Sequence, residues 1–187
     1  VAHGGQLITT EWALEKVLGP AFPCVVEYNK QTKWDEVVRI EVINREAQVI
    51  KGCLDEETAP VWWLERSSYP IRILDNDRVK VLIKSKELKE KYGEEAVLIK
   101  FEHGKGVVYH MISHFYLQRT ETKEALQNKS AVEYMSAKNI SADKATQLEE
   151  VIVKDNLNYG EVQSANTSAE FIMRAVIEQK KRNENNK

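Results

Sequence analysis

Two β-forming segments joined by a short glycine-containing turn are the feature that most constrains this chain. Residues 96–101 and 107–112 are rich in branched and aromatic side chains, which favour strands. Between them lies the sequence His-Gly-Lys-Gly (103–106), and glycines in so short a connection favour a tight hairpin. The sequence therefore predicts an antiparallel pair of strands. On the second strand, one face should carry Val107, Tyr109 and Met111, and the other Val108, His110 and Ile112.

The N-terminal residues predict a strand followed by a helix. A glycine pair, Gly4-Gly5, precedes the short apolar run 6–10, and Thr10 is a suitable N-cap for a helix that ends at Gly19-Pro20. A compact strand-to-helix step of this kind is typical of α/β proteins. The chain is therefore expected to belong to the α/β class.

Further elements follow from local patterns. Period-two alternation predicts a strand over 36–43, with a short partner over 47–50. Residues 60–70 are predicted to be irregular, and 78–84 to form a strand. Ser85 is then expected to cap a short helix that ends at Gly93.

The C-terminal third differs in composition. Residues 119–166 are polar and predict an insertion or extended loop, with some helix around 131–137. We expect this segment to contact a partner and to be dispensable for folding. A closing helix with a frayed tail is predicted over 167–187. The expected organisation is thus a core over 1–118, an insertion over 119–166 and the closing helix.

Composition excludes several classes of protein. Among 187 residues, 27 Lys and Arg nearly balance 29 Asp and Glu, which argues against a nucleic-acid partner or a basic membrane binder. No apolar run is long enough to span a membrane. The two cysteines favour free thiols in a reducing compartment, although one bridge between them stays possible. We therefore expect a cytoplasmic protein, and the sequence predicts no cofactor.

Three segments together resemble the class I glutamine amidotransferase-like superfamily, including its trehalose-utilisation (ThuA-like) branch. They are the glycine-pair, strand and helix step over 1–18, the hairpin that ends in Ser113-His114 (101–114), and the closing helix after Asn166. The resemblance implies a flavodoxin-like three-layer fold, of which this chain holds the C-terminal portion. Its sheet would then be incomplete at the N-terminus, and we expect either a missing portion of the same polypeptide or a protein partner there.

The resemblance also implies a catalytic position at His114. In the family, a histidine ends the strand after the glycine turn and an acid follows two positions later, where this chain has Tyr116. Neither Cys24 nor Cys53 lies in the family's Gly-x-Cys-x-Gly nucleophile turn. We therefore expect no catalytic residue in this chain and a structural His114, bonded to the backbone or to the closing helix. As an alternative, His114 is a base and Ser113 supplies a hydroxyl.

A metal site is not predicted from the histidines. His110 and His114 are four residues apart, which on a strand separates their Cα atoms by about 13 Å. Two ligands of one zinc ion need nitrogen atoms about 2.0–2.1 Å from it, so this spacing is unfavourable.

Aromatic residues offer a second candidate site. Trp62 and Trp63 point to opposite faces if the chain is extended there, so one of them could contact a ligand or partner, with Arg66 beside it. Equally, both could lie partly buried under the loop. Together with His110 and Tyr116, these residues are the candidate binding residues.

Two functions follow as hypotheses. One is a non-catalytic amidotransferase-like module for binding or assembly. The other is a hydrolase or amidotransferase whose nucleophile lies upstream of residue 1, with His114 as its base.

Overall fold

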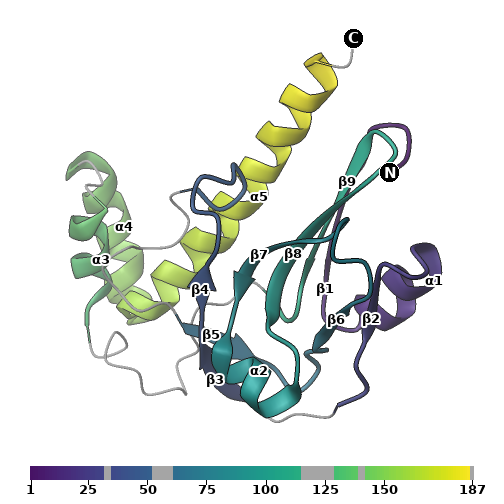
Figure 1. Ribbon diagram of the computed structural model, residues 1–187. Coiled ribbons are helices and arrows are strands. Elements are labelled where there is room, and N and C mark those ends of the chain that lie inside the picture. The colour runs from purple at the N-terminus through teal and green to yellow at the C-terminus, as the bar shows by residue number, and fades with distance from the viewer. Residues whose placement is uncertain (32–34, 52–60, 115–128, 139–141, 186–187) are drawn as a thin grey trace.

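A mixed β-sheet with helices on either side organises the computed structural model (Figure 1). The structure describes residues 1–187 except 32–34, 52–60, 115–128, 139–141 and 186–187. It also leaves out the side chains of 142–145, 147, 150 and 153. The α/β class predicted from the sequence is confirmed. Among the described helices, none combines the length and the apolar character that crossing a bilayer requires.

Within the described residues, seven strands form the main sheet, and their order is β1-β9-β8-β6-β2, with β7 pairing both β8 and β4. Only β1 and β9 run parallel in these pairings, and the other pairs are antiparallel. The strands are β1 (Gln6–Thr10), β2 (Val26–Tyr28), β4 (Glu41–Val42), β6 (Ile71–Ile73), β7 (Lys80–Lys84), β8 (Ala96–His103) and β9 (Gly106–Met111).

The predicted hairpin is confirmed as β8 and β9. Its register runs from Leu98 opposite Met111 to His103 opposite Gly106, and Gly104 adopts a φ of 60° in the turn. That left-handed conformation is available to glycine at little cost. Every residue of β9 is buried, so both faces of this strand are covered by other parts of the chain.

A second, two-stranded sheet pairs β3 (Glu36–Arg39) with β5 (Val61–Leu64). The predicted strand over 36–43 is therefore divided, because β3 pairs with β5 whereas β4 pairs with β7. The prediction that residues 60–70 are irregular was wrong, since this segment contains β5. Its four consecutive buried apolar residues lack the alternation that marks a half-exposed strand.

The strand predicted over 47–50 is also wrong, because this stretch forms successive turns. Asn44 Oδ1 accepts a hydrogen bond from the Glu46 N–H, and Ala47 O accepts bonds from the Ile50 and Lys51 N–H groups. A side chain that bonds the backbone two residues on stabilises a turn instead of a strand.

After β1 the chain turns sharply into a π-helical turn, η1 (Leu14–Leu18), which continues as α1 (Gly19–Ala21). The sequence predicted Thr10 as the cap of this helix and Gly19-Pro20 as its end, and both predictions were wrong. No side chain caps it, since the N-cap position is Ala13, and the Gly19-Pro20 pair does not end it. The Gly19 N–H donates to Leu14 O in the π pattern, and Pro20 stands in the first turn of α1, where a missing N–H costs little.

The predicted short helix is confirmed as α2 (Lys86–Tyr92). The Ser85 side chain accepts a hydrogen bond from the Leu88 N–H, and Gly93 ends the helix with a φ of 78°. Both signals are local, which explains why the sequence alone located them.

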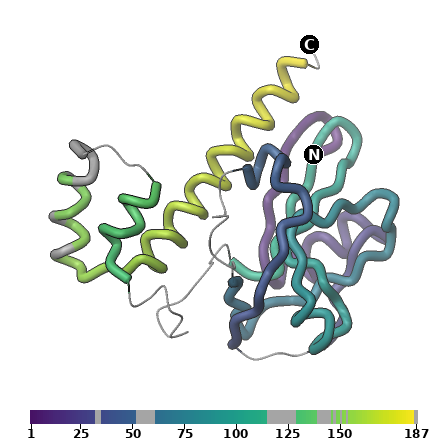
Figure 2. Tube along the Cα trace, turned by 60° about the vertical axis from the view of Figure 1, so that its left-hand side comes forward, coloured from purple at the N-terminus to yellow at the C-terminus, as the bar shows by residue number. Residues whose placement is uncertain are grey.

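Three helices follow: α3 (Ala131–Ala137), α4 (Ala142–Asp155) and α5 (Tyr159–Asn185). The first agrees with the predicted helix at 131–137. The last begins earlier than predicted, because Thr167 is buried inside the helix and its hydroxyl donates to Gln163 O. Figure 2 shows α3 and α4 on the far side of α5 from the sheet. They share a small apolar cluster of their own, formed by Ala131, Met135 and Ile152.

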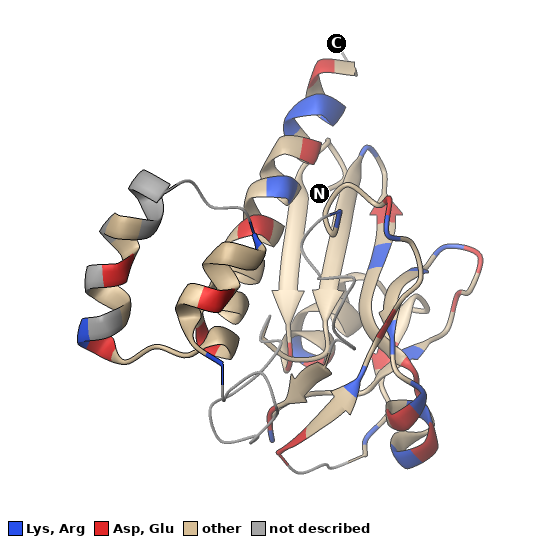
Figure 3. Cartoon of the chain, turned by 90° about the vertical axis from the view of Figure 1, so that its left-hand side faces the viewer, with Lys and Arg blue, Asp and Glu red and all other residues tan. Residues whose placement is uncertain are grey.

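The main core lies on both faces of the sheet. Phe171 and Ala175 of α5 join it from one side, while Leu14, Leu18 and Phe22 join it with the N-terminal helix. Acidic and basic residues are interspersed along the rest of α5 (Figure 3).

Candidate functional site

Three ionisable residues meet at strand ends. Glu11 directly follows β1, His114 follows β9, and Glu65 directly follows β5. Because β1 and β9 are parallel neighbours, their carboxyl ends lie at the same edge of the sheet. The Glu11 N–H donates to Met111 O over 3.0 Å, which extends this pairing to the start of the site.

His114 bridges the two carboxylates. Its Nδ1 lies 2.7 Å from Glu65 Oε1, and its Nε2 lies 3.4 Å from Glu11 Oε2. On the other side of Glu11, the Ser67 hydroxyl donates to Oε1. We call Glu11, Glu65 and His114 the EEH cluster.

The three side chains differ in exposure. Glu11 is buried, with 6% of its side chain exposed, whereas His114 exposes 48%. Glu65 is intermediate in exposure. Burial raises the pKa of its carboxyl, and the negative charge of Glu11 adds to this increase. The bond to His114 acts in the opposite direction and lowers the pKa. A carboxylate removed from water needs a charged or hydrogen-bonding partner, and here the same imidazole serves both acids.

Glu11 adopts an unusual backbone conformation. Its φ is 51°, in the left-handed region that residues with a Cβ avoid. It lies in the sharp connection from a strand to a helix, a kind of turn that directs a side chain out of the sheet edge. Such strained positions persist where the surrounding structure holds them, and they cluster at functional sites.

The EEH cluster offers ligand atoms to a metal ion. One atom from each residue can be chosen so that all three lie within 4.8 Å of one another. Carboxylate oxygen and imidazole nitrogen are both zinc ligands. The arrangement is equally that of an oriented base, because Glu65 holds one nitrogen of His114 and leaves the other directed at Glu11.

The structure corrects the partners predicted for His114. The described contacts of its ring are with Glu11 and Glu65, two residues at strand ends far away in the sequence. An acid does contact His114, and it is Glu65. Tyr116 lies outside the described residues.

Ser113, the alternative catalytic hydroxyl, is buried in the core. Its Oγ accepts a hydrogen bond from Trp62 Nε1 at 2.7 Å and donates to Trp63 O at 2.9 Å. A hydroxyl fixed in this way is a core connection between β5 and the segment after β9, and it is not accessible to a substrate.

Both tryptophans are buried, which agrees with the second of the two interpretations of this segment, and Trp63 also lines a hollow. Arg66 is exposed and lines a hollow of about 430 Å³ beside Trp63. The same hollow is lined by Glu65 and Ser67, so it adjoins the EEH cluster.

His110 is completely buried and separate from the EEH cluster. Burial lowers the pKa of its imidazole to about 3, and Nδ1 lies 3.0 Å from Thr9 Oγ1. A neutral, enclosed imidazole is unsuited to contact a partner at the surface. Cys24 is an exposed free thiol, and Cys53 lies outside the described residues.

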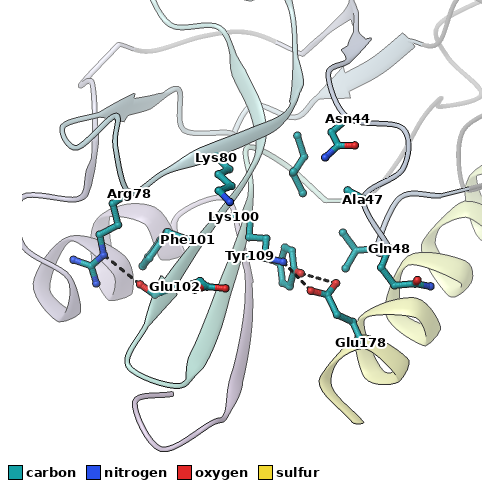
Figure 4. Close-up of a pocket in the computed structure, with 12 residues that line it drawn as sticks. Asn44, Ala47, Gln48, Arg78, Lys80, Lys100, Phe101, Glu102, Tyr109 and Glu178 are labelled. Carbon is teal, nitrogen blue, oxygen red and sulfur yellow. Dashed lines mark hydrogen bonds and ion pairs between the residues drawn. The ribbon is translucent and has the colours of Figure 1, made fainter. Parts of the chain in front are cut away.

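A second hollow, of about 190 Å³, lies between the sheet and α5 (Figure 4). Lys100 and Tyr109 both point at Glu178 of α5 there, with Nζ and OH 2.7 and 2.9 Å from its carboxylate oxygens. Burial and the Glu178 charge raise the pKa of Tyr109 above its usual range. The polar groups that face each other are mutually satisfied, which is typical of a contact that fixes a helix on a sheet.

Sequence reasoning missed Glu11 and Glu65. The available signal was that each acid directly follows a strand, at Thr10 and at Leu64, whereas the resemblance implied an acid close to His114 in the sequence. Comparison of the chain with protein-family models, with curated proteins and with solved structures finds no match.

Proposed function

We propose that this chain is a non-catalytic binding or assembly module with an amidotransferase-like, flavodoxin-like layout, and that the EEH cluster is its ligand site. The observation that carries the proposal is the bridge of His114 between Glu11 and Glu65 at the carboxyl edge of β1 and β9. Open α/β sheets bind ligands outside the carboxyl ends of their strands, which supports this location.

The chemistry of Glu11 favours binding over acyl transfer. A carboxylate that attacked glutamine would form an anhydride, which is more reactive than the amide it came from, so the step would be uphill. Among the described residues, Cys24 lies outside the cluster and Ser113 is enclosed. A nucleophile needs a base within about 2.6–3.2 Å, whereas the described contacts of the His114 ring are with the carboxylates of Glu65 and Glu11.

A turnover assay tests the proposal. The purified chain is incubated with glutamine and with a simple ester such as p-nitrophenyl acetate, beside the His114→Ala variant. We expect both proteins to release product at the rate of buffer alone. Turnover by the wild type that disappears in the variant would mean that the site is catalytic.

One observation favours a second function, that of a hydrolase or amidotransferase. Glu65 Oε1 holds His114 Nδ1 at 2.7 Å, as an orienting acid holds a catalytic base. In this alternative the chain is a hydrolase or amidotransferase, and its nucleophile comes from a segment that precedes Val1. A longer polypeptide that hydrolyses glutamine only with His114 intact would support it.

Assembly is the other part of the proposal, and the helical region supports it. Several large apolar side chains are exposed on α5, among them Ile172, Met173 and Val176, and exposed apolar groups of this kind are used at protein interfaces. If copies of the chain assemble through this face, Val176→Lys should lower the mass measured by light scattering at equal concentration.

We also propose a cytoplasmic location, which the free thiol of Cys24 supports.

A further inference from the structure

We infer that the EEH cluster binds one divalent transition-metal ion of the zinc or manganese type, an inference that rests on the proposed function and specifies its ligand. Glu11 and Glu65 would each contribute a carboxylate oxygen and His114 a ring nitrogen. These are three residues of ligating chemistry, brought together from the ends of β1, β5 and β9.

The distances are close to those that an ion needs. The chosen ligand atoms lie within 4.8 Å of one another. Ligands at about 2.0–2.2 Å from a tetrahedral ion are roughly 3.3–3.5 Å apart. The separation of 3.4 Å between His114 Nε2 and Glu11 Oε2 already meets this value. The ligand atom from Glu65 lies within 4.8 Å of the other two.

Charge balance also favours a cation. Two carboxylates, of Glu11 and Glu65, share one imidazole, that of His114. A divalent ion would neutralise both acids.

The most buried ligand is also the best supported. Ser67 donates to Glu11 Oε1, and the Glu11 N–H is bonded to Met111 O, so the carboxylate has a fixed position. Groups that hold a ligand in this way raise the affinity of metal sites. Glu11 would act as the rigid ligand, and the more exposed His114 would adjust to it.

The donor set and the surroundings identify the kind of ion. Mg²⁺ and Ca²⁺ prefer oxygen ligands alone, whereas an imidazole nitrogen suits Zn²⁺, Mn²⁺ and other transition ions. Three protein ligands leave a coordination position open. The hollow of about 430 Å³ shares Glu65 with the cluster and gives that position an approach from solvent.

Isothermal titration calorimetry of the chelator-treated chain with ZnCl₂, MnCl₂ and MgCl₂ tests the inference. The titrations are made on a Cys24→Ser background, because Cys24 is an exposed thiol that could itself bind zinc. We expect one Zn²⁺ per chain, weaker Mn²⁺ binding and no response to Mg²⁺.

Variants assign the ion to the EEH cluster. Glu11→Gln and His114→Ala should each weaken Zn²⁺ binding at least tenfold, whereas the matched variant His103→Ala, at the hairpin turn, should bind as the parent does. Circular dichroism checks folding, and Glu11→Asp serves if Glu11→Gln does not fold. Co²⁺ added to the parent should give visible absorption bands that His114→Ala lacks.

Two outcomes would overturn the inference: absence of stoichiometric Zn²⁺ or Co²⁺ binding by the folded parent, or binding that survives in both Glu11 and His114 variants. The failure of the proposed function looks different. It would appear as His114-dependent turnover of glutamine or ester, measured on the ion-free protein.

Discussion

His114 Nε2 lies 3.4 Å from Glu11 Oε2, although the two residues are far apart in the sequence. The pair exists because β1 and β9 are parallel neighbours and therefore end at the same edge of the sheet. Glu65 reaches the same imidazole from the separate β3–β5 sheet. Three strand ends thus build one polar site on an apolar framework.

The first prediction concerns Glu65 and pH. Burial raises the pKa of its carboxyl above the ordinary value of 4.5, so the folded protein holds this proton more firmly than the unfolded chain does. The free energy of unfolding should therefore fall as the pH rises from about 4.5 through the higher folded pKa. Urea unfolding from pH 4 to 7 should show this fall in the wild type and less of it in Glu65→Gln. An equal slope in both proteins would contradict the assignment, and Glu46→Gln, at an exposed position, is the control.

The second prediction has the opposite sign and concerns His110. Its pKa is about 3 in the folded protein against an ordinary 6.5, because burial disfavours the charged imidazole. This residue's contribution to stability is complete above pH 6.5 and is lost as the pH falls toward 3. His110→Leu should flatten the loss of stability over this range in urea unfolding. If the variant shows the acid sensitivity of the wild type, His110 is not its source.

The third prediction concerns Ser113, whose hydroxyl accepts the Trp62 indole N–H at 2.7 Å inside the core. Ser113→Ala removes this acceptor and should lower the free energy of unfolding by about 1–3 kcal/mol. Trp62→Phe and the double variant complete a thermodynamic cycle. Losses that simply add in the double variant would mean that the two side chains do not interact.

The fourth prediction concerns two glycines. A Cβ on Gly106 would lie 2.0 Å from Val1 O and 2.4 Å from Gly5 O, so Gly106→Ala must displace backbone and should cost about 2–3 kcal/mol. At Gly93 no atom lies within 4 Å of such a Cβ, and Gly93→Ala should cost only the left-handed strain of about 1–2 kcal/mol. Hydrogen exchange of the Val107 amide, which is bonded to Gly5 O, should rise only in the Gly106 variant.

The fifth prediction tests which face of α5 packs on the sheet. Phe171 is fully buried, and Phe171→Ala should cost about 3–5 kcal/mol. Its neighbour Ile172 is half exposed, and Ile172→Ala should change stability by no more than about 0.5 kcal/mol. Thermal and urea unfolding measure both variants. Equal losses would mean that the helix is rotated from the orientation described.

The elements that the sequence determined are those whose signals are local. The β8–β9 hairpin follows from two β-rich runs and the turn at Gly104, and α2 follows from the Ser85 cap and the terminal Gly93. In each case the interacting groups are a few residues apart, so their geometry is fixed by backbone conformation and side-chain type alone.

Only the tertiary structure decided the remaining features. β5 is a strand because its residues are buried and pair with β3, and nothing in four successive apolar residues distinguishes that outcome from an irregular buried segment. Likewise, Glu11, Glu65 and His114 become neighbours through the parallel pairing of β1 with β9 and the placement of β5. Contacts between residues distant in sequence depend on how strands are ordered in space, which local propensity does not encode.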